Sequence, residues 1–332
     1  MKIFVTGSSG FIGSFLCESL NKAGHEVYCL TRTIEKFKRF SIKGIPIVGE
    51  LSTSAPNSWI YEVPKDIDVV IHLAGIVHSY KPADFYKVNA EATRILVDDL
   101  KSHNPHLKFI LISSLAASGP SQKGIKKKEN DQEGPVSHYG KSKLAAESYL
   151  QNLGQGTWKK VVVRPPVVIG PRDPAMLEVF KMVKSGLVLI SGTDGLTKRY
   201  SFVSVHDLVA GIQRITEQEI KSNWDIFFFA HHKSFSFDEL IKEISSIFNE
   251  KKFYKLFLPY FFIHIVAWCA YMISKFFPLD FRLTPDKTRE LIPSCWEVDS
   301  EKSIIELGTD YKDSLQVSLK KAFTDYQDRS WL

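Results

Sequence analysis

The 332-residue chain has few cysteines, and they are widely spaced. Cys17, Cys29, Cys269 and Cys295 form no C-x-x-C pair, and the sequence predicts no metal site. Cys17 and Cys29 fall inside apolar, periodic segments, where a buried thiol is the ordinary interpretation. This pattern is typical of a reducing, intracellular setting.

Clustered positive charge is also scarce. The net charge is +6, and the lysines are scattered apart from a KKK run at 126–128, which we expect to be a solvated loop. The composition therefore argues against a nucleic-acid partner. A hydrophobic content of 44% with 24% charged residues is typical of a globular protein, and the length predicts one large domain or two unequal ones.

A cleavable leader is not expected either. A strand-like run begins at Lys2 and a glycine-containing turn follows it directly, which leaves no room for the apolar region of a signal peptide. We therefore expect a cytoplasmic chain, with association at the cytoplasmic face of a membrane as a further option.

The first half of the chain alternates strand-like and helical segments. Short runs of β-branched and aromatic residues occur at 2–6, 26–31, 45–48, 68–74, 108–113 and 160–165. Helical segments lie between them, notably 11–24, 83–103 and 138–153. Parallel strands need crossover helices and are buried on both faces, so this alternation predicts an α/β fold with a parallel sheet.

A glycine-rich turn, TGSSGFIG, joins the first strand to the first helix. Gly7, Gly10 and Gly13 occur at every third position. Glycines here allow a tight turn and a close approach of the backbone to a pyrophosphate, which the free N–H groups of the helix N-terminus would bind. A glycine pattern alone is weak, but its place between a strand and a helix indicates a dinucleotide site.

Three polar residues suggest acid/base chemistry. Tyr139 and Lys143 are four residues apart, on one face of a predicted helix. An ammonium near a phenol favours the phenolate, so the pair can transfer a proton, although alone it could equally be a surface pair. Ser114 ends a strand, where an α/β sheet presents its site residues.

Taken together, the ordered motifs resemble the extended short-chain dehydrogenase/reductases, a group that includes nucleotide-sugar epimerases and dehydratases, dihydroflavonol reductases and 3β-hydroxysteroid dehydrogenases. The motifs are TGSSGFIG, HLAG (72–75), Asn89 in KVNAEAT, the strand-end serine, Y-x-x-x-K, RPPVVIGP (164–171) and the stretch 299–308. The resemblance implies a Rossmann-type doubly wound parallel sheet with a smaller discontinuous substrate-binding domain. It divides the chain into 1–165 plus about 193–214, and 166–192 plus about 215–332.

The resemblance also implies roles for individual residues. Tyr139 would be the acid/base, Lys143 would lower its pKa and hold the nicotinamide ribose, and Ser114, chosen over Ser113 by spacing, would bond the substrate oxygen. Residues implied to contact the cofactor are Gly7, Gly10, Phe11, Ile12, Gly13, Arg32, Glu50, Leu51, Leu73, Ala74, Gly75, Asn89, Tyr139, Lys143 and Pro166. Ala116, Arg172 and Arg199 are candidates for substrate contact.

The end of the second strand bears on the cofactor. Arg32 stands there, followed by Lys36 and Lys38, with no acid before Glu35. A basic residue at this place suits the 2′-phosphate of NADP, whereas an acid would suit NAD. The sequence therefore favours NADP, although NAD remains open if Arg32 only stacks on the adenine.

The segment 192–212 resembles the return from the substrate domain to the sheet, with Asp207 at the family's acidic position. Nucleotide-sugar enzymes commonly carry a diphosphate-binding arginine seven residues earlier, where this chain has Tyr200, and a histidine where it has Ser204. These departures weaken the nucleotide-sugar interpretation. Arg172 or Arg199, which is one residue out of register, could still supply the charge.

The segment 256–279 is apolar, with one lysine and no acid. Pro259 and Pro278 bound about 27 Å of helix, slightly short of a bilayer core of about 30 Å. A transmembrane span would also separate residues 280–332 from the fold they should complete. We expect instead a helix on a membrane surface, preceded by Lys251, Lys252 and Lys255, or a lid over the substrate cleft.

The sequence thus predicts an NADP-dependent oxidoreductase that interconverts a secondary alcohol and a ketone on a fairly apolar small molecule. The first alternative is a nucleotide-sugar epimerase or dehydratase that uses NAD. The second is a non-catalytic dinucleotide-binding regulator. The resemblance further suggests a homodimer formed through the helices at 83–103 and 138–153.

Overall fold

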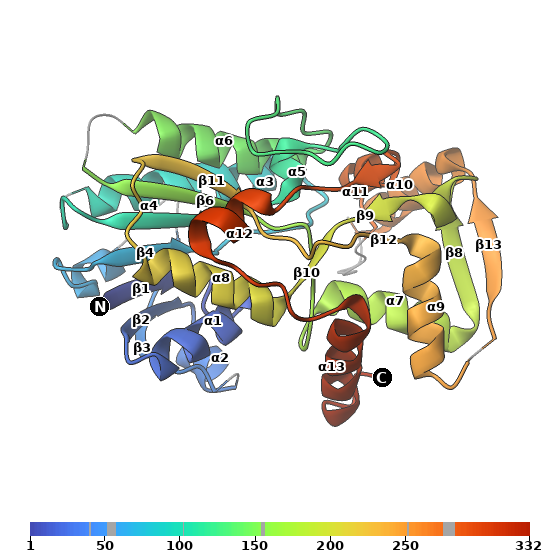
Figure 1. Ribbon diagram of the computed structural model, residues 1–332, viewed down its shortest axis with the longest axis horizontal. Coiled ribbons are helices and arrows are strands. Elements are labelled where there is room, and N and C mark those ends of the chain that lie inside the picture. The colour runs from blue at the N-terminus through green and yellow to red at the C-terminus, as the bar shows by residue number, and fades with distance from the viewer. Residues whose placement is uncertain (40, 52–57, 102, 154–156, 251, 275–282) are drawn as a thin grey trace.

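The computed structural model describes residues 1–39, 41–51, 58–101, 103–153, 157–250, 252–274 and 283–332 (Figure 1). Its main feature is a seven-stranded sheet in the order β11-β6-β5-β4-β1-β2-β3. The strands are β1 (Lys2–Thr6), β2 (Glu26–Thr31), β3 (Ile45–Val48), β4 (Val69–His72), β5 (Lys108–Ile112), β6 (Lys159–Arg164) and β11 (Trp224–Phe228). Every neighbouring pair is parallel, which confirms the predicted doubly wound α/β fold.

Helices cover both faces of this sheet, as its continuous apolar strands require. On one face lie α1 (Phe11–Lys22) and α8 (Val205–Glu217), and on the other lie α4 (Ala92–Leu100) and α6 (His138–Asn152) (Figure 1). The short helix α2 (Ile34–Arg39) connects β2 to β3. Two apolar cores result, one on each side of the sheet.

The helix predicted at 83–103 is present over residues 82–100, but it is not a uniform α-helix. It begins as α3 (Pro82–Phe85), passes through a π-helical turn, η2 (Tyr86–Glu91), and continues as α4. A π-turn inserts an extra residue into the helix and often marks a functional site. Asn89, a predicted cofactor contact, lies inside this turn.

The last strand of the sheet comes from an unexpected part of the chain. The sequence-based division assigned residues 215–332 to the smaller part, but β11 pairs with β6 at the edge of the large sheet. Helix α12 (Glu301–Leu307) packs beside it, with Lys302 Nζ 2.9 Å from Asp225 Oδ1. Part of the C-terminal region therefore completes the larger unit.

The smaller part contains helices and short strand pairs around a core that includes Phe180, Ile241 and Tyr326. Its helices are α7 (Pro174–Ser185), α9 (Phe237–Ile247), α10 (Tyr260–Ser274), α11 (Pro285–Leu291) and α13 (Leu315–Asp328). Its strands are β7 (Val167–Ile169) with β10 (Phe202–Ser204), β8 (Leu187–Ser191) with β13 (Tyr254–Leu258), and β9 (Arg199–Tyr200) between β12 (Phe235–Ser236) and β14 (Cys295–Trp296).

Helix α10 exposes most of its apolar surface. Its buried residues are Ile263 and Ala267, which lie one turn apart on one side. The exposed apolar residues are Phe261, Phe262, Ile265, Val266, Trp268 and Ile273. Among the described residues, no helix is long and apolar enough to cross a membrane. Residues 275–279 of the predicted apolar segment lie outside the described residues.

Candidate active site

The predicted cofactor residues meet at the carboxyl edge of the sheet. Gly7 follows β1 with a φ of +74°, and a Cβ there would lie 2.7 Å from the backbone N of Ala74, after β4. A Cβ on Gly13 would lie 2.2 Å from the carbonyl oxygen of Gly7. Only glycine fits these two close backbone contacts, and Leu73 borders the same contact.

The N-terminus of α1 is suited to an anion. Gly10 is its N-cap, and among the described residues no side chain caps it and no acid lies in its first turn. The amides of Phe11, Ile12 and Gly13 belong to the first turn of a helix and have no partner within it. Together with the positive end of the helix dipole, they can bind a pyrophosphate.

The predicted catalytic residues stand on neighbouring elements. Ser114 follows β5 and caps the short helix α5 (Leu115–Ser118), where its Oγ accepts the N–H of Ala116 at 3.1 Å. Tyr139 lies in the first turn of α6, and Lys143 lies one turn later. The Lys143 ammonium donates to the carbonyl oxygen of Ile112, at the end of β5, at 3.1 Å.

Gly75, Asn89 and Lys143 converge. A Cβ on Gly75 would lie 2.8 Å from Asn89 Oδ1 and 3.1 Å from Lys143 Nζ. The Asn89 amide also bonds both backbone polar groups of Ile76 and donates to Ser142 Oγ at 3.0 Å. The π-turn thus brings an amide close to the lysine ammonium, where a nicotinamide ribose would lie in the predicted cofactor site.

The electrostatics distinguish Tyr139 from Lys143. Burial raises the pKa of Tyr139, contact with the Ser114 hydroxyl lowers it, Glu290 raises it and Lys287 lowers it. Burial lowers the pKa of Lys143 to about 8, with the Glu147 carboxylate opposing that change. At neutral pH the tyrosine is therefore a neutral phenol and the lysine is mainly cationic.

Ser113, adjacent to Ser114, is already engaged. Its hydroxyl donates to Glu147 Oε1, and Glu147 pairs with Arg164 in a buried cluster beneath α6. The Ser114 hydroxyl, in contrast, lowers the pKa of Tyr139. The choice of Ser114 over Ser113, which was made from spacing, stays a prediction.

The strand-end residues near the predicted adenine site are placed around β2 and β3. Ser8 Oγ donates to the Leu30 carbonyl oxygen at 3.0 Å and so joins the glycine turn to the end of β2. Arg32 follows β2 and is exposed. Glu50 is exposed and its carbonyl accepts the Trp59 indole at 2.8 Å, while Leu51 packs against the core.

The remaining predicted site residues lie on several different elements. Pro166 follows β6, and Ala116 is buried in α5. Arg172 lies between β7 and α7, and its side chain packs against α1, where it donates to Ser14 Oγ at 3.0 Å and stacks on Phe15. Arg199 pairs with Glu297 at 3.1 Å and donates to Ser234. Both guanidinium groups thus have partners within the protein.

Sequence reasoning did not identify helix α11. Asp286 accepts the backbone N–H groups of His138 and Tyr139 at 2.7 and 3.0 Å, and Glu290 accepts Ser137 Oγ at 2.6 Å. The TPDKTRE sequence does signal a capped helix start, because Thr284 is the N-cap and Pro285 follows it. It does not reveal which helix the acids contact.

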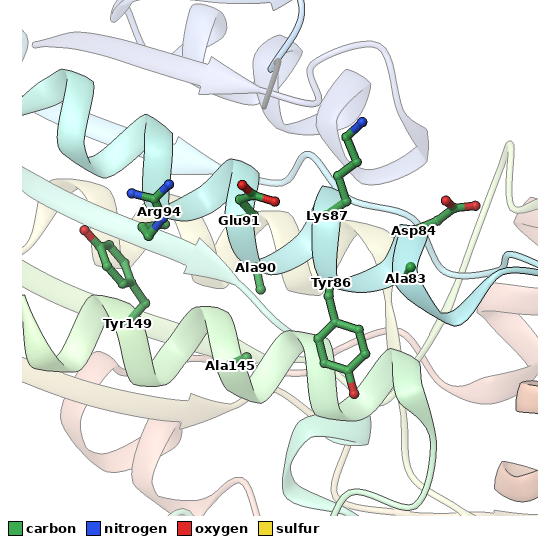
Figure 2. Close-up of a pocket in the computed structure, with 9 residues that line it drawn as sticks. All are labelled: Ala83, Asp84, Tyr86, Lys87, Ala90, Glu91, Arg94, Ala145 and Tyr149. Carbon is green, nitrogen blue, oxygen red and sulfur yellow. The ribbon is translucent and has the colours of Figure 1, made fainter. Parts of the chain in front are cut away.

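A groove of about 650 Å³ lies elsewhere, along the outer side of the helices (Figure 2). It is lined by Ala83, Asp84, Tyr86, Lys87, Ala90, Glu91, Arg94, Ala145 and Tyr149. These residues come from α3, η2, α4 and α6, and Tyr139 and Lys143 are not among them. The groove is therefore separate from the predicted catalytic residues.

The chain was compared with known proteins. The family model "NAD dependent epimerase/dehydratase family" matches residues 3–226. The UDP-glucose 4-epimerase of Vibrio cholerae is 28% identical over 83% of this chain and 82% of its own length. The ceramide reductase of Caulobacter vibrioides is 28% identical, and the match spans 63% of this chain but only 58% of that protein.

Solved structures show the same fold. The UDP-glucuronic acid 4-epimerase of Bacillus cereus, in complex with UDP-glucuronic acid and NAD, has a TM-score of 0.77 and 21% identity, and the match covers 99% of this chain and 100% of that one. The UDP-glucose 4-epimerase of Thermotoga maritima, with UDP-glucose, has a TM-score of 0.76 and 22% identity, with coverage of 99% and 100%.

Proposed function

Because the chain belongs to the NAD-dependent epimerase/dehydratase family, we propose that it interconverts a secondary alcohol and a ketone on a fairly apolar small molecule with NADP. Members of this family include NAD(P)-dependent enzymes of the extended short-chain dehydrogenase/reductase type. The observation that carries this proposal is that Ser114, which follows β5, and Lys143, which bonds the end of β5, lie at the same carboxyl edge of the parallel sheet as the glycine turn after β1. A bound nicotinamide dinucleotide supplies or accepts the hydride.

The protein's own residues supply the proton and hold the substrate oxygen. Tyr139 is a neutral phenol in this environment, so it can donate a proton to a ketone oxygen as that oxygen becomes an alkoxide. Ser114 contacts Tyr139 and can bond the same oxygen. Lys143 places a mainly cationic group beside Asn89, where a ribose hydroxyl would accept from it.

The preference for NADP rests on Arg32. This residue is exposed and directly follows β2. Near the end of the same strand, the Leu30 carbonyl oxygen accepts the Ser8 hydroxyl of the glycine turn. An arginine at this point suits a 2′-phosphate. NAD is the alternative, and the matched epimerase of Bacillus cereus is in complex with NAD.

The apolar substrate class is supported by two observations. The ceramide reductase of C. vibrioides and the sterol-4-alpha-carboxylate 3-dehydrogenase of Dictyostelium discoideum are both relatives, and a ceramide and a sterol are apolar molecules. In addition, Arg172 and Arg199, the candidate diphosphate ligands, are engaged with Ser14 and Glu297. Apolar ketones such as a sterol ketone are therefore the first substrates to test.

The alternative function is a nucleotide-sugar epimerase or dehydratase, which the matched Vibrio cholerae epimerase favours. Turnover assays distinguish the two proposals. The oxidoreductase oxidises added NADPH steadily with one ketone of an apolar panel, whereas the epimerase retains NAD through purification and interconverts UDP-sugars without net coenzyme turnover. A non-catalytic regulator would bind NADPH but turn over neither panel.

We also propose that α10 lies on an anionic lipid surface. Phe261 is 70% exposed and Trp268 is 58% exposed, so water would contact a large apolar face. The β8–β13 ribbon leads into this helix. Exposed Lys184 and Lys252 stand at the start of the ribbon, the end away from α10, where Gly186 O accepts Tyr254 N at 2.8 Å. An exposed apolar helix face is typical of a surface-bound helix, and lysines that precede it in the chain suit anionic headgroups.

Vesicle sedimentation tests this surface. We expect the protein to bind phosphatidylcholine vesicles that contain phosphatidylserine and to bind pure phosphatidylcholine less. The Phe261→Ser/Trp268→Ser variant should lose binding, while Ile305→Ser, which changes an apolar residue on α12 that is 72% exposed, should not. Absence of vesicle binding together with self-association through α10 in solution would show a second copy as the occupant.

Finally, we propose a homodimer through α3, η2, α4 and α6. The groove between these helices presents Tyr86, Ala145 and Tyr149 along its length (Figure 2). An Ala145→Arg substitution would place a charge in the groove. Light scattering should then report a monomer for this variant and a dimer for the wild type, and a monomeric wild type would contradict the proposal.

A further inference from the structure

The first turn of α6, which carries Tyr139, is bonded to a residue from a distant part of the chain. Asp286, on α11, accepts the N–H groups of His138 and Tyr139 at 2.7 and 3.0 Å. Asp286 is only 7% exposed, so water competes little for these bonds. The first N–H groups of a helix have no partner within it, and a carboxylate there also faces the positive end of the helix dipole. Asp286 therefore supplies the acceptor that the backbone of Tyr139 lacks within α6.

The residue before this turn is bonded to α11 as well. Ser137 is the N-cap of α6, and its hydroxyl oxygen accepts the N–H of Gly140 at 3.0 Å. The same hydroxyl donates to Glu290 Oε1 at 2.6 Å. Asp286 and Glu290 are four residues apart and so lie on one face of α11. That face bonds two N–H groups of α6 directly and a third through Ser137.

Contacts at other points hold α11 in place. At its C-terminal end, the buried Lys198 ammonium donates to the carbonyl oxygens of Leu291 and Ile292. In its middle, Thr288 Oγ1 lies 2.7 Å from His264 Nδ1 of α10. Because α11 is bonded to elements other than α6, it is a fixed support for the first turn of that helix.

Tyr139 and Lys143 are held by different parts of the protein. The Lys143 ammonium donates to the carbonyl oxygen of Ile112 at 3.1 Å and is thereby tied to the sheet. The Tyr139 ring packs on the buried Phe85 ring of α3, with centroids 6.1 Å apart, while its backbone is bonded to Asp286. If the bonds to Asp286 were lost, the tyrosine could shift while the lysine stayed in place.

We propose that Asp286 is a positioning residue that holds the Tyr139 phenol within reach of the substrate oxygen. The inference rests on the proposed function, because it assumes that Tyr139 transfers the proton. A displacement of about 1 Å in a reacting group can lower a rate by about 10²-fold. The glycine turn that would bind the coenzyme lies on β1 and α1, so the loss should appear in kcat and not in the KM for NADPH.

Two substitutions of Asp286 test the proposal. Asp286→Ala removes both acceptors and should lower kcat by about 10- to 100-fold, with the KM for NADPH within about twofold of the wild type. Asp286→Asn keeps the shape and one oxygen that can accept an N–H group, so it should lose less activity, about tenfold or below. The matched control is Asp68→Ala. The Asp68 carboxylate also accepts a backbone N–H, that of Lys2 at 2.7 Å, but at the amino edge of the sheet, so kcat should not change.

A double-mutant cycle separates positioning from a general loss of structure. If Asp286 acts by placing the Tyr139 hydroxyl, no hydroxyl is left to misplace in Tyr139→Phe. Adding Asp286→Ala to that variant should then leave its residual turnover, measured at high enzyme concentration, within about twofold. A merely structural role would lower the residual turnover by the same factor as in the wild type. That result, or an unchanged kcat in Asp286→Ala alone, would overturn the inference.

Amide hydrogen exchange, followed by NMR, gives a readout that needs no substrate. In Asp286→Ala the N–H groups of His138 and Tyr139 should exchange about tenfold faster or more, because their acceptor is gone, while those in the middle of α6 keep their rates. Unchanged exchange at both residues would overturn the inference alone. Faster exchange together with full turnover in Tyr139→Phe would instead contradict the proposed function.

Discussion

Arg164 Nη2 lies 2.5 Å from Glu147 Oε2, and the two side chains are only 1% and 2% exposed. Arg164 ends β6, and Glu147 lies one turn after Lys143 on α6. The pair therefore bonds α6, which carries Tyr139 and Lys143, to the sheet beneath it. Glu133 adds a second carboxylate at 3.1 Å from the same guanidinium nitrogen.

Breaking this pair from one side should destabilise the fold. Glu147→Ala leaves the buried arginine with the Glu133 carboxylate, whose side chain is 37% exposed, so the loss should lie near the lower end of the about 3–5 kcal/mol expected for breaking a buried pair. Urea unfolding followed by circular dichroism measures the change. The matched control is Glu18→Ala, which removes the partner of Lys22 in an exposed pair on α1 and should cost about 0.5 kcal/mol. Equal losses in both variants would contradict the assignment of a buried pair.

Tyr139→Phe should reduce the turnover of ketone and NADPH by about 10²- to 10⁴-fold, because the ring keeps its packing but loses the proton donor. NADPH binding, measured by fluorescence titration, should change little. Ser114→Ala should reduce kcat less, and Ser148→Ala, on the exposed side of α6, should leave it unchanged. Full turnover in Tyr139→Phe would exclude the acid/base role.

Gly7→Ala and Gly24→Ala separate backbone strain from steric contact. Both glycines have a positive φ, of +74° and +82°, so both substitutions incur about 1–2 kcal/mol of strain. A Cβ at Gly24 meets nothing within 4 Å, whereas at Gly7 it would clash with Ala74. We expect only Gly7→Ala to lose further stability and to weaken NADPH binding. Identical melting and binding curves for the two variants would show that the turn at Gly7 has room for a Cβ.

Arg32→Ala should weaken NADPH much more than NADH, because it removes a charge-assisted bond to the 2′-phosphate worth about 1.5–3 kcal/mol, or at least about tenfold. The ratio of kcat/KM for the two coenzymes is the measurement. Arg94→Ala, on α4, is the control. A ratio unchanged from wild type would leave Arg32 as a stacking residue and favour NAD.

His72 should make stability depend on acid pH. Burial, with a contribution from the Lys143 charge, lowers its pKa from 6.5 to about 3, while its ring bonds Thr6 and Thr93. Between these two values the unfolded chain binds a proton that the folded chain does not, so stability falls as the pH drops from 6.5 towards 3. His72→Gln should give a shallower slope in urea unfolding at several pH values, and His106→Gln, an exposed control, should not.

The sheet and the family were predictable because their signals are local. Short apolar runs such as 2–6 and 108–113 identify buried strands without knowledge of their partners, and all six predicted runs form strands of the sheet. The family resemblance, which depends on motifs such as TGSSGFIG in a fixed order, was confirmed by the family match. The roles given to individual site residues remain predictions.

The remaining features depend on contacts between distant segments. The sequence WDIFF does not predict that β11 joins the large sheet. Its partner β6 lies far earlier in the chain, before α7 and α8. Asp286 of α11 accepts backbone N–H groups of α6, and backbone groups carry no sequence signal. The apolar pattern of α10 correctly suggested an unusual helix, but periodicity does not tell which side of a helix is covered.

Strand β11 is synthesised well after its partner β6, and this order has a consequence for folding on the ribosome. Until Phe228 has emerged, β6 is an open sheet edge that offers unpaired backbone groups to any neighbouring strand. A nascent chain in which the glycine turn after β1 has already formed therefore still has an unpaired edge strand, and this intermediate is prone to misassembly. Chains shortened to end before Trp224 should aggregate even though every residue of the Ser114, Tyr139 and Lys143 group is present.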